Sequence, residues 1–162
     1  MRKLIPRAAL AALVLVAASQ LIRPARTNPV TDPSRTMAAQ MSIPPDAKAV
    51  LERACGDCHS NDTRWPWYSN VAPVSWFVID HVNSGRRHFN YSDWPPAGRP
   101  GRPASSDGPR KVLKDACELV RKGEMPISNY LWMHADARLS DRDKEALCAW
   151  SEDALRALPQ GR

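Results

Sequence analysis

The sequence predicts a mostly α-helical domain that is preceded by an N-terminal apolar helix. After the first apolar run, four stretches have apolar residues spaced for one face of a helix, and none shows the clean alternation of a strand. Glycine and proline residues separate these stretches. A chain of 162 residues, of which 43% are hydrophobic, is long enough for one packed domain and too short for a TIM barrel or a two-domain dehydrogenase.

Residues 1–23 are predicted to be a signal peptide or a membrane anchor. Three basic residues among the first seven precede an apolar run from Ala8 to Ile22, which has the length of a signal-peptide core and is short for a spanning helix. The alternative is that residues 4–22 are retained as an anchor in the inner membrane. In both cases the basic cluster stays cytoplasmic, so the remainder of the chain is expected in the periplasm.

The net charge of +6 comes largely from this first segment. Four of the 23 basic residues lie in residues 1–23, and no acidic residue occurs before Asp32, so the rest of the chain carries a balance of only +2. No stripe of Lys and Arg is interleaved with aromatic residues. Nucleic acid is therefore not expected as a partner.

Residues 24–45 are predicted to be an extended Pro-rich tether, and residues 46–158 to be the helical domain. The tether holds five prolines among Thr, Ser, Asn and Asp. The helices expected in the domain are one capped by Asp46, one from Pro73 that stops at Gly85, one from about Asp107 to Lys122 with Gly123 past its end, and one opened by a capping box of Ser140 and Asp143.

The run Cys55-Gly56-Asp57-Cys58-His59 is the pattern of c-type haem attachment. Two thiols one helical turn apart can each add to a haem vinyl group, and the adjacent histidine then lies under the iron. We therefore expect one covalent haem c, with Cys55 and Cys58 as thioethers and His59 as the proximal ligand. Three alternatives compete: a thioredoxin-like dithiol, which needs a βαβ setting; a zinc site completed by Cys117 and Cys148; and a Cys55–Cys58 disulfide, which leaves His59 unexplained.

Met125 is the best candidate for the distal iron ligand. It precedes Pro126, which disfavours helical geometry at the residue before it, so the thioether is expected in an irregular loop where it can turn toward iron. Packing of Met125 in a loop is the alternative interpretation. The rival distal ligands are Met133, His81, His88 and His134, of which His134 is the strongest.

Cys117 and Cys148 fall on two of the predicted helices. In an oxidising compartment a remaining even pair suggests a disulfide, which would tie those helices together across the Met125 loop. Two buried free thiols are the alternative.

The segment after the haem motif makes the sequence recognisable. The run from Cys55 to Ser69, with Trp65-Pro66-Trp67-Tyr68-Ser69 at its end, resembles the bacterial haem-binding domain family related to c-type cytochromes. Further matching segments are Ala72-Pro73-Val74-Ser75-Trp76, Gly85-Arg86, Asn90-Tyr91-Ser92-Asp93-Trp94 and Gly123-Glu124-Met125-Pro126, so that the resemblance covers about residues 28–155. It implies a covalently bound haem, a cytochrome c-like helical fold, and an exported, often membrane-tethered domain.

Two groups of side chains could surround the cofactor. Trp65, Trp67, Trp76 and Trp94 either wall the haem edge or form ordinary core. Arg86 and Arg87 either pair with the haem propionates or belong to a solvated face.

These features together predict a one-electron carrier rather than an enzyme, because an iron with two protein ligands has no open site for substrate. Its partners would be a redox protein, which the sequence does not name, and the membrane. If Met125 does not bind, an open iron would favour a haem-based sensor of small ligands or a peroxidase-like enzyme. A third hypothesis is an assembly module that presents haem to a partner oxidase.

Overall fold

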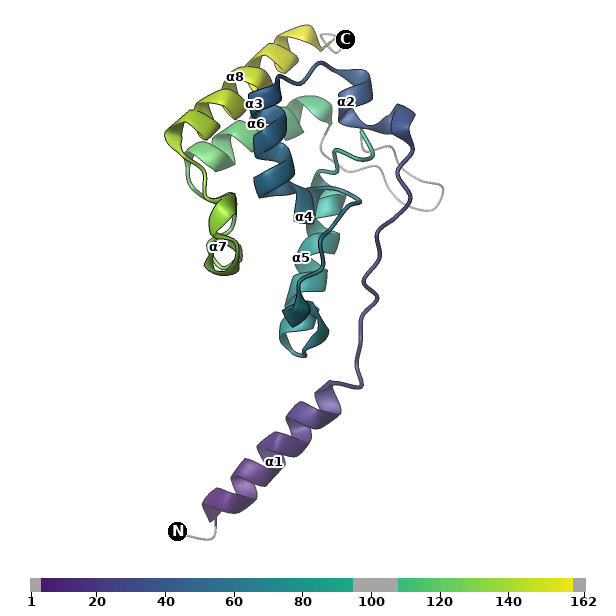
Figure 1. Ribbon diagram of the computed structural model, residues 1–162, viewed down its shortest axis with the longest axis vertical. Coiled ribbons are helices and arrows are strands. Elements are labelled where there is room, and N and C mark those ends of the chain that lie inside the picture. Colours follow the sequence, from purple (N-terminus) through teal and green to yellow (C-terminus); the bar gives the residue numbers. More distant parts are fainter. Residues whose placement is uncertain (1–3, 95–107, 159–162) are drawn as a thin grey trace.

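A computed structural model describes residues 4–94 and 108–158 of the chain. Those residues form helices and connecting segments without a strand, so the expectation of a mostly α-helical protein is confirmed. The helix α1 (Leu4–Ser19) leaves a packed domain and is joined to it by an extended segment, as Figure 1 shows. The other elements are η1 (Pro33–Arg35), α2 (Met37–Gln40), α3 (Pro45–Val50), the π-helical η2 (Leu51–Cys55), α4 (Gly56–His59), η3 (Trp67–Asn70), α5 (Val74–His88), α6 (Pro109–Arg121), α7 (Tyr130–Met133), η4 (Ala135–Ala137) and α8 (Asp141–Ala157).

The helix α1 is built of apolar residues whose side chains are largely exposed, including Leu13 and Leu15. It ends at Ser19, three residues before the expected end of the apolar run. Among the described residues, we find no helix that combines the length and the apolarity required for a membrane span.

The core lies where α3, α6 and α8 meet. In Figure 1, α6 and α8 lie side by side with α3 packed on them, and their contacts bury Val50, Leu113 and Leu147 almost completely. Trp150 is buried as well, and its indole Nε1 donates to the carbonyl of Ser42 (3.1 Å). Burial of large apolar side chains at such a junction supplies most of the stability of a domain of this size.

Two helix ends agree with the sequence predictions. Ser140 and Asp143 form the expected capping box at the start of α8. Gly123 follows α6 with φ of 71°, and the amides of Gly123 and Glu124 donate to the carbonyls of Val120 (3.1 Å) and Leu119 (2.9 Å). This is a Schellman motif, and it ends α6 just before the Met125 loop.

Three other helix predictions need correction. The helix α3 begins at Pro45, and Pro44 rather than Asp46 is its N-cap, because proline at the first helical position already has the required φ. Gly85 does not end α5, which continues to His88. The expected start of the third helix at Asp107 lies outside the described residues, and α6 runs over Pro109–Arg121.

The second half of the predicted tether is not extended but folds onto the domain. Met37, in α2, is 1% exposed in the core, and its amide donates to the carbonyl of Tyr91 (2.8 Å). Arg35 pairs with Asp93 (2.7 Å). The proline content suggested a free linker, but the apolar Met37 side chain is stabilised by burial in the core.

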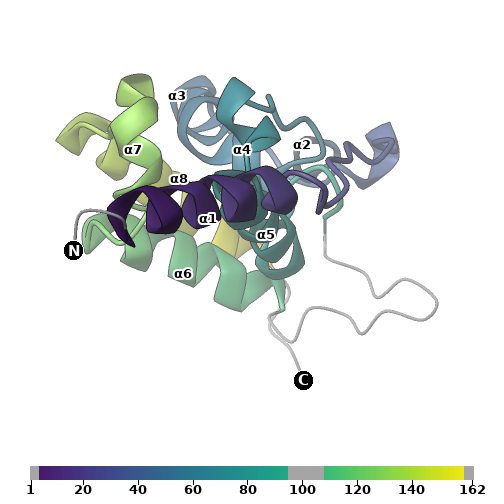
Figure 2. The same cartoon turned by 90° about the horizontal axis from the view of Figure 1, so that it is seen from below.

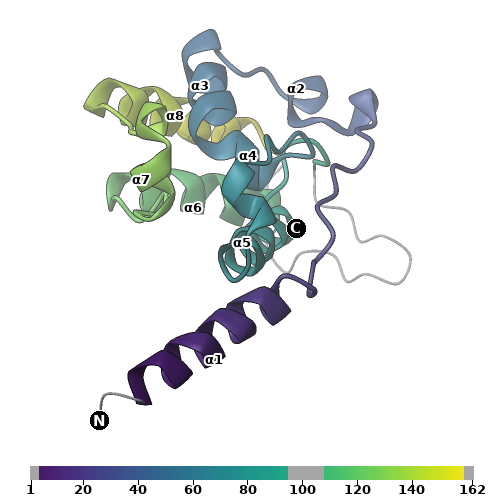
Figure 3. The same ribbon diagram turned by 60° about the horizontal axis from the view of Figure 1, so that its bottom comes forward.

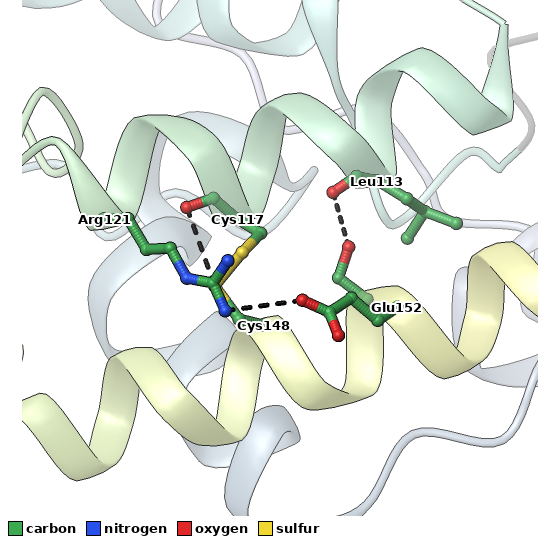
Figure 4. The surroundings of a disulfide bond; sticks show 6 residues. Leu113, Cys117, Arg121, Cys148 and Glu152 are labelled. Atoms are coloured by element: carbon green, nitrogen blue, oxygen red, sulfur yellow. Dashed lines mark hydrogen bonds and ion pairs between the residues drawn. A yellow bond between two sulfur atoms is a disulfide. The ribbon is translucent and has the colours of Figure 1, made fainter.

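Cys117 and Cys148 form a disulfide between α6 and α8. Figure 4 shows the bridge on the facing sides of the two helices, with the Cα atoms 4.8 Å apart. Beside it, Arg121 on α6 lies 3.3 Å from the carboxylate of Glu152 on α8. The bridge therefore joins the helix before the Met125 loop to the last helix of the chain.

Removing this disulfide with Cys117→Ser and Cys148→Ser is expected to lower the free energy of unfolding by about 3–4 kcal/mol. The bridge closes a loop in the unfolded chain and so reduces the number of conformations that the unfolded state can adopt. Denaturant unfolding followed by circular dichroism measures the change. The wild type in excess reductant serves as the matched control and should shift by a similar amount. Alkylation of Cys117 or Cys148 in unreduced protein would contradict the bridge.

Candidate functional site: a cavity beside the Cys-x-x-Cys-His motif

One cavity of about 390 Å³ brings together the residues on which the sequence analysis depends. Cys55, Cys58, His59 and Met125 all line it. Its walls come from the η2–α4 segment, from α5 and α6, and from the loop that follows α6, with mainly apolar side chains between them. A volume of this size lies within the range of small-molecule and cofactor sites.

One ring nitrogen of His59 is hydrogen-bonded to a backbone carbonyl. Its Nδ1 lies 3.0 Å from the carbonyl oxygen of Phe89, just after α5, and the two rings pack at 5.3 Å. Because a carbonyl oxygen can only accept, Nδ1 carries the proton and Nε2 keeps a lone pair. Burial lowers the pKa of His59, which keeps the imidazole neutral at neutral pH. A neutral imidazole with an oriented Nδ1–H is the form that binds a metal through Nε2.

Cys55 and Cys58 are both free and both at least half buried at the cavity. Burial raises the pKa of Cys55 to about 12 and that of Cys58 to about 11, with a smaller contribution from the neighbouring thiol and from Asp57 respectively. A dithiol that exchanges disulfides needs a lowered thiol pKa, so this environment does not suit the thioredoxin-like alternative.

The zinc alternative and the Cys55–Cys58 disulfide are also contradicted. Cys117 and Cys148 are bonded to each other, and so they cannot complete a four-cysteine site. Within the part of the chain that the structure describes, no cluster of three or more His, Cys, Asp or Glu could hold a metal ion.

The motif helix α4 packs very closely against α5 at Gly85. A Cβ atom at Gly85 would lie 2.5 Å from the carbonyl oxygen of Cys58. Glycine is therefore required here by a close approach of two backbones, and not as a helix stop. This contact brings Phe89 within reach of His59.

Met125 lies in the loop that the Schellman motif of α6 begins. Its side chain is partly buried against the core and lines the cavity together with Pro126 and Ile127. Its amide donates to the carbonyl of Leu119 (3.2 Å), which fixes the start of the loop. The thioether therefore faces the same cavity as His59, from a different part of the fold.

A hydrogen bond connects this loop region to the motif itself. The hydroxyl of Tyr130, on α7, donates to the Asp57 carboxylate (2.8 Å), which is 9% exposed between the two cysteines. Burial and the Asp57 charge raise the pKa of Tyr130, so its hydroxyl remains a donor at neutral pH. Through this bond, Asp57 helps to position Tyr130 and with it the part of the cavity wall that includes Met125.

His134 does not reach the cavity, and it is a poor rival for the distal position. Its ring stacks on Tyr130 at 3.9 Å. Its Nδ1 donates to the Tyr130 carbonyl (3.0 Å), and its Nε2 lies 3.5 Å from the hydroxyl of Tyr68. Both ring nitrogens are therefore engaged by the protein.

The site residues fit a flat and largely apolar cofactor that carries a metal. The cavity combines apolar walls with two thiols, one imidazole whose Nε2 keeps its lone pair, and one thioether. The sequence profile of the haem-binding domain family matches residues 14–153. The chain belongs to this family. No curated protein and no solved structure matches the chain significantly.

The tryptophans of this haem-binding domain do not wall its cavity. Trp94 is 2% exposed in the core, where it packs edge-on against Phe89, and Trp67 is 72% exposed on the surface. Trp65 and Trp76 donate to Asn28 Oδ1 (3.1 Å) and to the Ile22 carbonyl (2.8 Å). The alternative interpretation, ordinary core, holds for Trp94, whereas Trp65 and Trp76 bind the segment that follows α1 and Trp67 lies on the surface.

Arg86 is likewise a structural residue of the haem-binding domain. Its guanidinium donates to the carbonyls of Ser60 and Thr27 and to the side chains of Thr63 and Asn28, at 2.6–3.1 Å. These bonds join α5, the segment after the motif and the chain that follows α1. Neither Arg86 nor Arg87 is among the residues that line the cavity.

The sequence analysis missed Ser84, Lys111 and Asp115 at the cavity. His81 and His88 were weighed as iron ligands and as acid–base groups of a peroxidase-like enzyme, and both line the cavity with Nδ1 bonded to a backbone carbonyl of α5. Lys111 and Asp115, one turn apart on α6, form an ion pair at the same cavity. The spacing of His81, Ser84 and His88 along one face of α5 was the available signal.

Proposed function

We propose that the protein is a membrane-associated, periplasmic haem c protein that carries single electrons. The observation that carries the proposal is the meeting of Cys55, Cys58, His59 and Met125 around one cavity in a member of the haem-binding domain family. Thiols, an imidazole and a thioether are the groups needed to attach a haem covalently and to ligate its iron on both faces.

Each residue has a separate role. The thiols of Cys55 and Cys58 would hold the haem, each by adding across one vinyl group with the sulfur on one carbon and the thiol hydrogen on its neighbour. His59 offers Nε2 to the iron while Phe89 orients the ring. Met125 would offer its sulfur from the loop that follows α6. When bound, the haem supplies a one-electron iron(III)/iron(II) couple.

The apolar walls of the cavity and the thioether of Met125 would both raise the reduction potential of the iron. A thioether favours the reduced ion relative to a second imidazole, and a low-dielectric wall disfavours the extra charge of the oxidised iron. The apolar side chains of Val112, Leu119 and Val120, on α6, contribute to this wall. We therefore expect a higher reduction potential than bis-histidine ligation would give.

The absorption spectrum of protein matured with haem c tests the proposal. Oxidised wild type should be low-spin with a sulfur-to-iron charge-transfer band, and Met125→Ala should lose that band completely. Met133→Ala is the matched control, because Met133 is exposed and does not line the cavity. Wild-type protein should also pass one electron to ferricyanide without any added substrate.

A high-spin spectrum of the wild type with rapid carbon monoxide binding would contradict the carrier. That result would favour a sensor or a peroxidase-like enzyme, for which His81 and His88, the other imidazoles at the cavity, are the candidate acid–base groups. Loss of the charge-transfer band in His134→Ala but not in Met125→Ala would contradict the choice of distal ligand.

A further inference from the structure

The end of α1 is bonded directly to the domain. The side-chain amide nitrogen of Gln20 donates to the backbone carbonyl of Ala72 (3.0 Å), and the Ala72 backbone amide donates back to the side-chain Oε1 of Gln20 (3.0 Å). The indole of Trp76 donates to the carbonyl of Ile22 (2.8 Å). These three bonds set the position at which the apolar helix leaves the domain, near the start of α5.

An exposed apolar surface surrounds this attachment. We name it the α1-proximal face, and its members are Leu21, Ile22, Trp67, Val71, Val74 and Phe77, each at least 45% exposed. Figures 1 and 3 show α1 running away from the side of the domain on which α5 begins, while α2 and α8 lie at the opposite side, and in Figure 2, seen from below, α1 lies in front of the domain. The face is thus continuous with α1, and it has the aromatic and apolar composition of a membrane-interface belt.

A small polar pocket lies at the same attachment. It has a volume of about 200 Å³, and its lining includes the side chains of Arg23, Arg26, Ser69, Asn70 and Ser75. Arg23 Nε donates to the Gln20 carbonyl (3.0 Å), and Arg26 donates to the Ser69 hydroxyl (3.4 Å). No carboxylate is among the residues that line this pocket. The Ser69 hydroxyl and the Asn70 amide beside the arginines already donate to the carbonyls of Pro66 (2.6 Å) and Trp67 (2.9 Å). The two guanidinium groups are therefore the donors that suit a phosphate ester.

We propose that the α1-proximal face rests on the surface of a lipid bilayer and that the pocket of Arg23 and Arg26 receives the phosphate of a lipid headgroup. The proposal rests on the membrane association proposed above. It adds that the α1-proximal face is the part of the domain that lipid buries. The apolar side chains enter the interface beside α1, and the two arginines lie at the level where an apolar helix meets the headgroups.

The consequence is a fixed orientation of the haem cavity. Val74 and Phe77 continue the same face of α5 as His81, Ser84 and His88, which line the cavity, and the rings of Phe77 and His81 pack at 3.9 Å. Contact between the α1-proximal face and lipid therefore holds the cavity at a constant height above the bilayer, whereas a flexible tether would let it rotate.

Photo-crosslinking tests this placement on the haem-loaded full chain in nanodiscs of anionic phosphatidylglycerol. The lipid carries a diazirine near its glycerophosphate. Mass spectrometry should find cross-links in residues 67–77 as well as in α1, and several-fold fewer in α2 and α8. Cross-links confined to α1 in protein with an unchanged haem spectrum would overturn the placement while leaving the haem proposal intact.

A second comparison tests the headgroup pocket. Arg23→Gln and Arg26→Gln should each lower the cross-linking of residues 67–77 by up to about fivefold, as expected for one lost cation near an anionic surface. Arg142→Gln, an exposed arginine on α8, should leave it unchanged. Equal cross-linking in all variants would overturn the role of the arginines.

Glycerol 3-phosphate distinguishes a lipid from a soluble phosphate. Millimolar glycerol 3-phosphate should leave the cross-linking of residues 67–77 unchanged, because the lipid phosphates beside the anchored face have a much higher effective concentration than the soluble competitor. Complete competition would assign the pocket to a soluble ligand and overturn the proposal. Labelling of the face by a water-soluble carbene reagent, but not by lipid, would instead mark a protein-docking surface and also overturn it.

Discussion

Full-length protein that carries both Cys55→Ala and Cys58→Ala is expected to lose all haem that survives denaturing electrophoresis. Only a covalent bond keeps haem on an unfolded chain, and these two thiols are the free cysteines at the cavity. Peroxidase-based haem staining of the denatured band, with the intact mass as a second readout, measures the loss.

The single variants sharpen this test. Cys55→Ala or Cys58→Ala alone should keep one thioether and therefore a weaker haem stain with an altered absorption maximum. Ser84→Ala is a suitable control, because Ser84 lines the same cavity but offers no thiol. Haem stain that persists in the double variant would contradict covalent attachment through this motif.

Replacement of Gly85 by alanine is expected to destabilise the domain by about 3 kcal/mol, at the upper end of the usual cost of overpacking. The new Cβ would meet the carbonyl oxygen of Cys58 at 2.5 Å and its carbonyl carbon at 3.1 Å. Both are backbone atoms of the motif helix, so neither can turn away as a flexible side chain would. The helices must separate, and the bond between His59 and the Phe89 carbonyl should lengthen.

Gly108→Ala is the matched control for this substitution. A Cβ at Gly108, the N-cap of α6, meets no atom of the described residues within 4 Å, so its effect should stay within about 1 kcal/mol. Denaturant unfolding of both variants measures the difference, and the haem stain shows whether attachment suffers as well. A Gly85→Ala protein as stable as the wild type would contradict the close packing of α4 against α5.

The proposed bilayer contact would fix the orientation of the domain relative to the membrane. The bonds from Gln20 to Ala72 and from Trp76 to Ile22 place the start of α5 beside the exit of α1. The same helix lines the haem cavity further along. A carrier arranged in this way would meet a membrane-bound redox partner in a defined orientation, and electron transfer between the two would depend on lipid composition.

The local features of this protein could be predicted from the sequence. The motif Cys55–His59, the capping box of Ser140 and the glycine after α6 each concern groups within about one helical turn, so the spacing along the chain also sets the spacing in space. The disulfide partners could be proposed for a different reason, because two cysteines remained after the motif was assigned.

The features that depend on long-range packing could not be predicted. Met37 was expected in an extended tether and lies in the core, and the sequence left open whether the tryptophans wall the cofactor or form core, whereas in the structure none of the four lines the cavity. Gly85 was interpreted as a helix stop, although its function is to let α5 approach the backbone of Cys58. The sequence could not reveal these roles, because the partner atoms lie tens of residues away.

The sequence by itself determined the chemistry that this protein can offer: two thiols and an imidazole at attachment spacing, a methionine in a loop, and an apolar segment ahead of them. The tertiary structure alone decided that these groups share one cavity and that Phe89 orients His59. It also decided that Tyr130 and Asp57 join the loop region to the motif. The physical reason is that side-chain identity is a local property, whereas contact is decided by how all the helices bury their apolar faces together.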